Sequence, residues 1–385
     1  MRMRRIEAIF TAKGAANMAS YIHERPGWPG FHWDSERLAT PLGQVRHAQG
    51  RLLGRLEALG FPARAEASLS SLTEEIIESS AIEGEQLARP QVRSSLARRL
   101  GVDIGALAPV DRNVEGVVEL VLDATQHYAA PLTEERLYGW HAGLFPTGYS
   151  HMARIVVGAW RNDSAGPMQV VSGPIGAERV HFEAPEASRL PAEMKAFFDW
   201  FNAEQGLDAV LKAGVAHLWF VTIHPFEDGN GRIARAIADL MLARSENSAQ
   251  RFYSMSAQIR QERSEYYAIL ESTQKGDLDV TRWLEWFLGC LGRAFEGAET
   301  ILAGVLGKAR FWEQHSTAGL NERQRLLVNR LLDGFEGKLT SSKWAKIAKC
   351  SPDTALRDID GLIGVGILRR VDAGGRSTSY SLVAP

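Results

Sequence analysis

The strongest constraint on the fold is a long apolar segment that a proline and two glycines interrupt. Residues 209–223 are almost entirely apolar, which predicts a helix buried on all sides. Pro225 disfavours helical geometry at the residue before it, so this helix should end at His224. Beyond the glycines, apolar side chains return at helical spacing: Ile233, Ile237, Leu240 and Met241. The sequence therefore predicts two helices joined by a short loop.

The loop between these helices has the composition of an anion site. A glycine-rich turn that opens a helix presents free N–H groups and the positive end of the helix dipole to a negative ligand. Residues 229–231 form such a turn, and phosphate is the natural candidate for the ligand. Asp228, beside the turn, is a hard oxygen ligand for Mg²⁺. Asn230, within it, can donate an amide hydrogen to a phosphate oxygen.

Two arginines and a histidine complete the set. Arg232 and Arg235 share one face of the first turn, where positive charge opposes the helix dipole by ~0.3–1 kcal/mol. A bound anion would offset that cost. His224 is then the candidate base for an attacking hydroxyl group. The segment as a whole predicts phosphate chemistry rather than packing alone.

Residues 224–235 resemble the complete signature of the Fic family, whose members typically move AMP from ATP onto a protein hydroxyl. The resemblance implies that His224 deprotonates the target side chain. It implies that Asp228 holds Mg²⁺ on the α- and β-phosphates. The remaining motif residues would bind the phosphates: Gly229, Asn230, Gly231, Arg232 and Arg235.

Two further segments resemble parts of Fic proteins. A capping box at residues 71–74 predicts a helix over about 71–84. Its end resembles the inhibitory pattern of many members, which implies that Glu83 lies against Arg235 in the resting site. Residues 264–270 resemble the segment that closes the adenine side of the pocket, with Tyr267 as the candidate contact to the base.

A β-hairpin is predicted upstream of the motif. Residues 168–172 and 179–182 are short β-like runs on either side of a turn rich in glycine and proline. In the family, a hairpin flap at this place aligns the target segment by main-chain pairing. The resemblance implies that a target protein docks along residues 168–182.

The C-terminal part reads as a winged helix-turn-helix. Three helical patterns precede two short strands, and residues 321–385 carry a net charge of +4, from eleven Lys and Arg against seven Asp and Glu. Thr354, Arg357 and Asp358 are expected to face outward from the recognition helix, with Arg376 at the tip of the wing. The partner of this domain is left open between DNA and protein.

Composition is that of a globular protein, with 45% hydrophobic and 23% charged residues in a chain of 385. We expect an N-terminal Fic-associated region at 1–60, the Fic domain at 61–318 and the winged helix at 319–385. Cys290 and Cys350 have neither disulfide nor zinc spacing, which fits a reducing compartment. With no membrane segment, the expectation is a soluble, cytoplasmic protein.

The sequence thus predicts a mainly α fold: a Fic-type helical bundle with a β-hairpin flap and a C-terminal winged helix. The favoured function is transfer of AMP from ATP, with Mg²⁺, to a Ser, Thr or Tyr hydroxyl, under inhibition by Glu83. One alternative is a phosphodiesterase that removes AMP from proteins. Another is a DNA-binding regulator that senses nucleotide, although the intact His224 argues against a pure sensor. The oligomeric state stays open, with a homodimer among the options.

Overall fold

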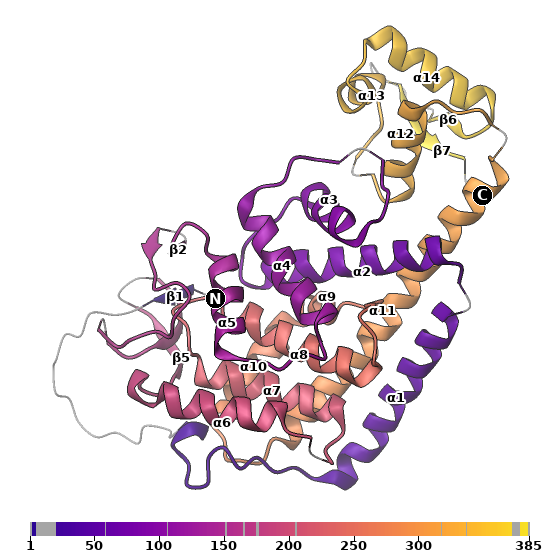
Figure 1. The fold of residues 1–385 in the computed structure, drawn as a ribbon. Helices are drawn as coiled ribbons and strands as arrows, with labels where there is room; N and C mark the ends of the chain where they lie inside the picture. The colour runs from indigo at the N-terminus through magenta and orange to yellow at the C-terminus, as the bar shows by residue number, and fades with distance from the viewer. Residues whose placement is uncertain are drawn as a thin grey trace. The chain divides into compact units, whose positions relative to one another are not determined.

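The computed structural model describes residues 2–4, 21–57, 59–105, 107–150, 152–164, 166–174, 177–204, 206–316, 318–335, 337–371 and 378–383. It is mainly helical, which confirms the predicted fold class (Figure 1). The chain divides into two compact units: Met1–Val102 with Ala108–Glu299, and Asp103–Leu107 with Thr300–Pro385.

The first unit is a helical bundle with a small sheet. Its helices are α1 (Ser35–Glu57), α2 (Phe61–Ile82), α3 (Arg89–Leu100), α4 (Arg112–Gln126), α5 (Glu134–Leu144), α6 (Leu190–Asn202), α7 (Ala209–Ile223), α8 (Asn230–Glu246), α9 (Met255–Gln261), α10 (Arg263–Gln274) and the start of α11 (Thr281–Gln314). Its strands are β1 (Arg2–Arg4), β2 (Tyr149–Ser150), β3 (Ala153–Arg154), β4 (Gln169–Ser172) and β5 (Arg179–Glu183).

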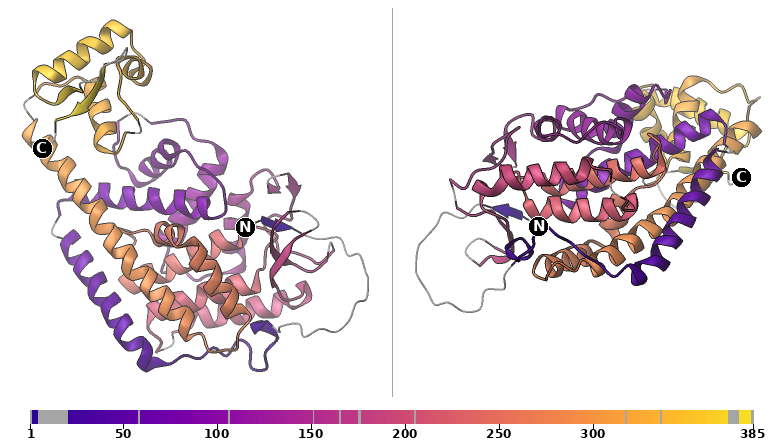
Figure 2. Two further views of the ribbon diagram at one scale, coloured as in Figure 1. Left: turned by 180° about the vertical axis from the view of Figure 1, so that it is seen from behind. Right: turned by 60° about the horizontal axis from the view of Figure 1, so that its bottom comes forward.

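Helices α7 and α8 form the centre of this unit and run side by side (Figure 2). Every residue of α7 from Val210 to Ile223 is buried, as the unbroken apolar run predicts. Gly214 lets α11 approach, because a Cβ there would lie 2.9 Å from Leu284 Cδ2. The Trp283 indole donates to the Gly214 carbonyl at 2.8 Å. The motif loop is thus built between two fixed helices.

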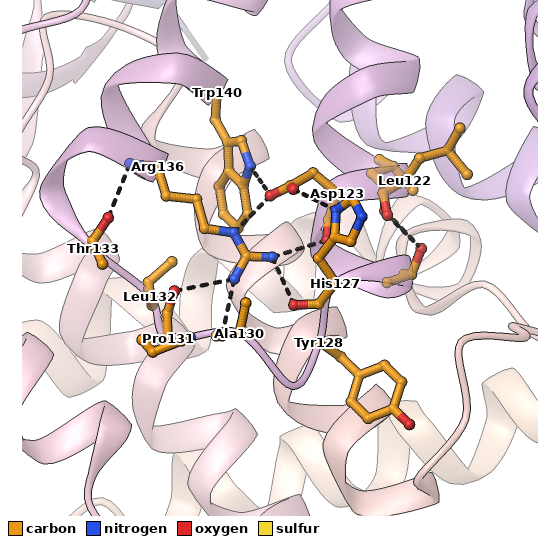
Figure 3. Close-up of polar contacts among 12 residues, drawn as sticks. Leu122, Asp123, His127, Tyr128, Ala130, Pro131, Leu132, Thr133, Arg136 and Trp140 are labelled. Atoms are coloured by element: carbon orange, nitrogen blue, oxygen red, sulfur yellow. Dashed lines mark hydrogen bonds and ion pairs between the residues drawn. The ribbon is translucent and has the colours of Figure 1, made fainter.

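A polar cluster fastens the turn between α4 and α5, which carries α5 against the motif loop (Figure 3). Arg136 donates to Asp123 Oδ2 at 2.6 Å and to carbonyl oxygens of the turn, among them those of Ala130 and Pro131. The Trp140 indole donates to Asp123 Oδ2 at 2.7 Å. Burial opposes ionisation of Asp123, but hydrogen bonds from Arg136, His127 and Trp140 hold its pKa below the usual value.

The helix that ends before Glu83 begins earlier than the capping box predicts. Helix α2 starts at Phe61, after Gly60 and with Pro62 in its first turn. N–H groups in the first turn make no helical hydrogen bond, so a proline is tolerated there. The predicted start at residue 71 is therefore wrong. Ser71 is fully buried inside the helix, and the Thr73 hydroxyl donates back to the Leu69 carbonyl at 2.6 Å. Tertiary burial of this face outweighs the local capping signal.

The predicted hairpin is confirmed. Strands β4 and β5 pair antiparallel, and β1 joins β4 to give the sheet order β1-β4-β5. Val170 is opposite Phe182 and Val171 is opposite Val180, so His181 is an extra residue without a partner across the ladder. Such a bulge bends the strand and redirects the side chain it carries.

The second unit contains the end of α11, α12 (Glu322–Leu332), α13 (Ser341–Ala348), α14 (Pro352–Gly364), and the hairpin β6 (Leu368–Val371) with β7 (Ser379–Leu382). It begins at Thr300 rather than near 319, because α11 runs on without a break and places Phe311 in the small core. The outward position expected for Asp358 is wrong: this carboxylate is buried and accepts from Arg323 Nε at 2.8 Å. Arg376 lies outside the described residues.

A membrane-spanning helix would need a longer and more apolar run than any helix in the described parts of the chain provides.

Candidate active site

The motif loop leaves α7 at His224, which adopts a left-handed conformation with φ of 53°. Its main-chain N–H still donates to the Phe220 carbonyl at 3.0 Å, so the helix ends one residue before the proline. The Phe226 ring is buried and stacks on the His141 imidazole at 4.2 Å between centroids. Gly229, at φ of 80°, packs closely enough that a Cβ would lie 3.0 Å from the Phe145 ring. Both contacts come from the end of α5, which therefore packs tightly against the loop.

The Asn230 side chain stabilises this loop from within. Its Oδ1 accepts from the Phe226 N–H at 3.0 Å and its Nδ2 donates to the Phe226 carbonyl at 2.8 Å. The prediction that this side-chain amide binds a phosphate is therefore not supported. A buried amide must find partners, and here it finds them on the main chain of the loop. The side chain of Asn230 is therefore occupied, and only its main-chain N–H, in the first turn of α8, is available to an anion.

His224 has the environment of a neutral base. The side chain is 2% exposed, and Nδ1 is 3.1 Å from the Val221 carbonyl. A carbonyl can only accept, so the proton sits on Nδ1 and Nε2 keeps its lone pair. Among the described residues Nε2 has no hydrogen-bond partner. Burial lowers the pKa of His224 to about 4, which keeps the ring unprotonated at neutral pH.

Arg161 fixes the main chain on both sides of this base. Its Nε donates to the His224 carbonyl at 2.8 Å, and its main-chain N–H donates to the Pro225 carbonyl at 2.9 Å. A third donation reaches the carbonyl of Pro185, just beyond β5. The base of the hairpin is thus tied to the loop that carries His224.

Asp228 lies in the same loop, directly before Gly229, and is half-buried. Its Oδ1 accepts from the Gly229 N–H at 2.6 Å, and its Oδ2 accepts from the Ser150 hydroxyl on β2. These two contacts orient a carboxylate whose oxygens have further lone pairs. Asp228 is therefore placed to bind a cation beside the anion site.

The first turn of α8 forms the anion site itself. Ile233 is the first residue to make the helical hydrogen bond, from its N–H to the Gly229 carbonyl at 3.0 Å. Asn230, Gly231 and Arg232 come before it in the first turn, where no carbonyl of the helix can accept from their N–H groups. Together with the helix dipole they attract negative charge.

That position already lies against a carboxylate of the protein's own chain. Glu83 follows directly after α2, and a Cβ on Gly231 would lie 2.2 Å from its Oε1. The same Oε1 is 2.9 Å from Arg235 Nη2, a guanidinium that is 3% exposed. Burial opposes the charge on Arg235, but the Glu83 carboxylate more than offsets it and raises the pKa of the guanidinium. Glu83 therefore competes with any anion for Arg235.

Two other groups on or just after α2 hold the motif arginines. Arg235 donates from Nε to the Ser79 hydroxyl and from Nη2 to the Ser79 carbonyl, both at 2.9 Å. Arg232 Nη1 donates to Glu85 Oε2 at 2.5 Å, while its guanidinium lies 5.1 Å from the Phe145 ring centroid. Both arginines are thus paired with glutamates two residues apart.

Tyr267 lies on the same side of the site, on α10. Burial, followed by the charge of Glu83, raises its pKa to about 12, so the phenol keeps its proton. The Arg263 guanidinium lies 5.2 Å from the Tyr267 ring centroid, and its Nε donates to the Ile82 carbonyl at 3.0 Å. Arg263 therefore connects Tyr267 to the end of α2.

The structure brings together every residue that the sequence singles out for the site. Ser79 is the first residue of the pattern that ends at Glu83 and Gly84, whereas sequence reasoning missed three contributors: Glu85, Arg161 and Arg263. Glu85 could have been found, since it follows Glu83 and Gly84 as a second acid on the same turn. Nothing local to Arg161 or Arg263 predicts their partners, which lie 63 and 181 residues away in sequence.

Comparison with known proteins agrees with this geometry. Residues 131–242 match the family model described as Fic/DOC family, and residues 21–102 match one described as a domain of unknown function, DUF4172. "Protein adenylyltransferase Fic" of Drosophila mojavensis is 28% identical over 249 residues, 63% of this chain and 44% of that protein. "Protein adenylyltransferase fic-1" of Caenorhabditis elegans is 39% identical over 88 residues, 22% of this chain and 16% of that protein. The chain spans less than half the length of these curated relatives.

Solved structures share the fold. A Fic family protein from Desulfovibrio desulfuricans G20 aligns over 90% of this chain and 96% of its own, with a TM-score of 0.51 and 20% identity. A Fic domain containing signaling protein from Bacteroides thetaiotaomicron VPI-5482 covers 68% of this chain and 97% of its own, with a TM-score of 0.51 and 22% identity. At such identities the likeness shows the fold alone. The matched model covers the loop between the two central helices and most of both helices, so residues 131–242 of this chain are similar to the Fic/DOC family.

Proposed function

We propose that this protein transfers AMP from ATP to a serine, threonine or tyrosine hydroxyl of a target protein. The observation that carries the proposal is the meeting of a neutral buried imidazole, a turn of free N–H groups and two guanidinium groups at the start of α8. A pocket that only senses a nucleotide needs no base, whereas attack by a hydroxyl does. The relatives named protein adenylyltransferase support the same chemistry.

In the proposed reaction, His224 Nε2 takes the proton of the target hydroxyl as its oxygen bonds to the α-phosphorus. The bond between that phosphorus and the bridging oxygen breaks, and pyrophosphate leaves with the electron pair. The first-turn N–H groups of α8 hold the phosphate oxygens, and Arg232 and Arg235 bind the β- and γ-phosphates. The protein thus contributes mainly positioning and charge stabilisation.

Asp228 is the residue that fits Mg²⁺. A single oriented carboxylate next to substrate phosphates is a usual setting for this ion, which takes its other ligands from phosphate and water. In the parts of the chain that the structure describes, no group of three or more His, Cys, Asp or Glu could hold a metal alone. When bound, the ion would add positive charge beside the phosphate oxygens.

We propose that Glu83 inhibits this reaction. Its carboxylate pairs with Arg235 and lies over Gly231, where phosphate oxygens would bind. ATP bound beside it would lack the γ-phosphate contact, which would leave the α-phosphorus out of line for attack. Activation then requires the turn after α2 to move away from α8.

The same position of Glu83 also favours a second candidate, removal of AMP from a modified protein. A carboxylate beside the phosphate site can orient a water for attack on the phosphorus. The two activities make opposite demands on Glu83, since it inhibits transfer and assists hydrolysis. Its replacement therefore distinguishes them.

The hairpin is the proposed docking site for the target, along residues 168–182 and the rest of β5. The sheet order leaves β5 at an edge, where an extended segment could add by main-chain pairing. Arg161 ties the base of this hairpin to the loop of His224. A segment added to β5 would therefore be aligned with the base.

The second unit is proposed to be a winged helix that binds DNA or a protein partner. Arg357 is exposed on α14, the helix expected to make the contact. If the partner is DNA, affinity should fall steeply with salt, and Arg357→Ala should weaken it. Binding that ignores both changes would indicate a protein partner.

The function is tested by incubating the purified chain with a cell lysate and ATP labelled at the α- or the γ-phosphate. Label from the α-position alone should appear on protein, and mass spectrometry should find AMP on a hydroxyl side chain. Asp199→Asn is the control, since Asp199 and its partner Lys195 are both exposed side chains on α6. Label from the γ-position, or no label with any variant, would refute the proposal.

A further inference from the structure

A serine, a histidine and a glutamate form a connected set on the hairpin, outside the site described above. Ser172 Oγ lies 2.6 Å from His181 Nε2, and His181 Nδ1 lies 2.6 Å from Glu271 Oε2. Ser172 ends β4, His181 lies on β5, and Glu271 comes from α10. A hydroxyl, an imidazole and a carboxylate in this order are the parts of an activated nucleophile.

The charges within the set fix the direction of its hydrogen bonds. Burial opposes ionisation of Glu271, but hydrogen bonds from Lys275 and His181 lower its pKa to about 2, so it is charged at neutral pH. A charged carboxylate can only accept, so in the neutral imidazole the proton lies on Nδ1. Nε2 then accepts from the Ser172 hydroxyl, which is the arrangement that prepares a serine for attack.

The backbone is shaped to make this contact. His181 is the extra residue of the β-bulge, and Ser172 pairs with Arg179, two residues before it. Bulges redirect side chains and are common beside active sites. A ladder that continued regularly from Val170 and Phe182 would pair His181 with Val171, and Ser172 and His181 would then point to opposite faces of the sheet. The bulge is therefore what turns the imidazole to the serine. The next residues, Gly173 and Pro174, are exposed, which leaves the serine at an accessible tip.

We propose that Ser172 is a nucleophilic serine and that it accepts AMP from ATP held in the site of a second copy of this chain. This inference rests on the proposed adenylyltransferase function for its electrophile. The Ser172 oxygen bonds to the α-phosphorus, and its proton passes to His181 Nε2. The bond to the bridging oxygen breaks, and pyrophosphate leaves with the electron pair.

The reaction runs between copies because the hairpin holds Ser172 away from its own site. Arg161 fixes Pro185 beside His224, and Pro185 lies six positions of largely extended chain after Arg179, the partner of Ser172. At ~3.3 Å per residue, Ser172 lies roughly 20 Å along the strand from the base. Glu271 pins the far end of the hairpin to α10, so the tip cannot fold back.

The first test measures the reactivity of the serine without ATP. The full chain is treated with a fluorophosphonate, which labels nucleophilic serines, and the sites are mapped by mass spectrometry. Ser172 should react at least tenfold faster than Ser188, an exposed serine whose hydroxyl contacts Glu186 and no histidine. His181→Ala and Glu271→Gln should each lower the rate on Ser172 at least tenfold.

Arg179→Ala is the matched control. The Arg179 guanidinium also joins the hairpin to Glu271, at 3.1 Å, whereas Arg179 faces Ser172 through the main-chain ladder, which an alanine keeps. It should leave the labelling of Ser172 unchanged. If Arg179→Ala lowers labelling as much as His181→Ala does, or if Ser172 reacts no faster than Ser188, Glu271 only anchors the hairpin and the inference is overturned.

The second test mixes two versions of the full chain with α-labelled ATP. The donor carries Glu83→Gly and Ser172→Ala, and the acceptor carries His224→Ala with Ser172 intact. AMP should appear on Ser172 of the acceptor and fall at least tenfold when the acceptor also carries His181→Ala. Label on lysate proteins but not on Ser172 overturns this inference and leaves the proposed function standing. A fluorophosphonate-reactive Ser172 with no AMP on any protein refutes the proposed function and, with it, Ser172 as an AMP acceptor.

Discussion

Replacing Glu83 by glycine should raise AMP transfer, because it frees the guanidinium that the γ-phosphate needs. The pair between Glu83 Oε1 and Arg235 Nη2 is 2.9 Å long, and its side chains are 19% and 3% exposed, so solvent screens it little. A charge-assisted hydrogen bond of this kind contributes ~1.5–3 kcal/mol. Since each ~1.4 kcal/mol is a factor of ten, transfer should rise roughly ten- to a hundred-fold.

Two substitutions distinguish the effect of the charge of Glu83 on transfer from the effect of its size. Glu83→Gln removes the charge but keeps a side chain over Gly231, where the carboxylate oxygen lies 2.2 Å from the position of a Cβ. It should therefore activate less than Glu83→Gly. Adding Arg235→Ala to Glu83→Gly should abolish the gain, because the freed arginine is then absent.

The assay is the initial rate of label transfer from α-labelled ATP to lysate protein. Glu74→Gln is the matched control, since Glu74 lies on the same helix but pairs with Arg89 at the surface. A Glu83→Gly protein that is folded and no faster than wild type would refute the inhibitory role. If it also fails to remove AMP that wild type removes, the activity is de-adenylylation.

Three further results are expected. His224→Ala should abolish transfer and leave ATP binding by calorimetry within about twofold, since the base acts on the hydroxyl and not on the nucleotide; full transfer by the pure variant would exclude His224. Because burial lowers the pKa of His224 to about 4, kcat/KM of Glu83→Gly should stay constant as the pH falls through 6.5 and should decline only near pH 4. A decline of kcat/KM near pH 6.5 would instead show that the imidazole is exposed to solvent. Glu85→Gln should raise transfer by at most about fivefold, because this glutamate is 36% exposed and exposed ion pairs contribute only ~0.2–1 kcal/mol. A gain as large as that of Glu83→Gly would contradict the inference that Glu83 inhibits more strongly than Glu85.

The central helices could be predicted from sequence because burial and local geometry agree there. The apolar run of α7, the break before Pro225 and the return of apolar spacing after the glycines each point to the same two helices. The hairpin was predicted for a similar reason, since its β-like runs flank a turn of glycine and proline. The bulge at His181 was not predicted, because the position of an extra residue in a strand depends on tertiary packing and has no local sequence signal here.

The errors arise where tertiary contacts outweigh local signals. Ser71 and Thr73 resemble a helix start, but both are buried in mid-helix, and the Thr73 hydroxyl donates to the Leu69 carbonyl of the same helix. Asn230 suits a phosphate, yet the sharp loop needs both ends of its amide. Asp358 has the spacing of an outward residue, but Arg323 lies close enough to pair with it in the folded unit.

The way α2 is anchored fits both the proposed inhibition by Glu83 and its proposed release. Glu75, buried within α2, accepts from Ser254 Oγ at 2.8 Å and from the Ser256 N–H at 3.0 Å at the start of α9, which fixes the middle of the helix. Glu83 stands one residue past the helix end, and Gly84 follows it at φ of 88°, with space around it. The carboxylate that we propose to be inhibitory thus sits on a turn outside the helix. We expect the buried anchor at Glu75 to set where Glu83 rests, and Gly84 to give the turn the conformational freedom that release of Glu83 would need.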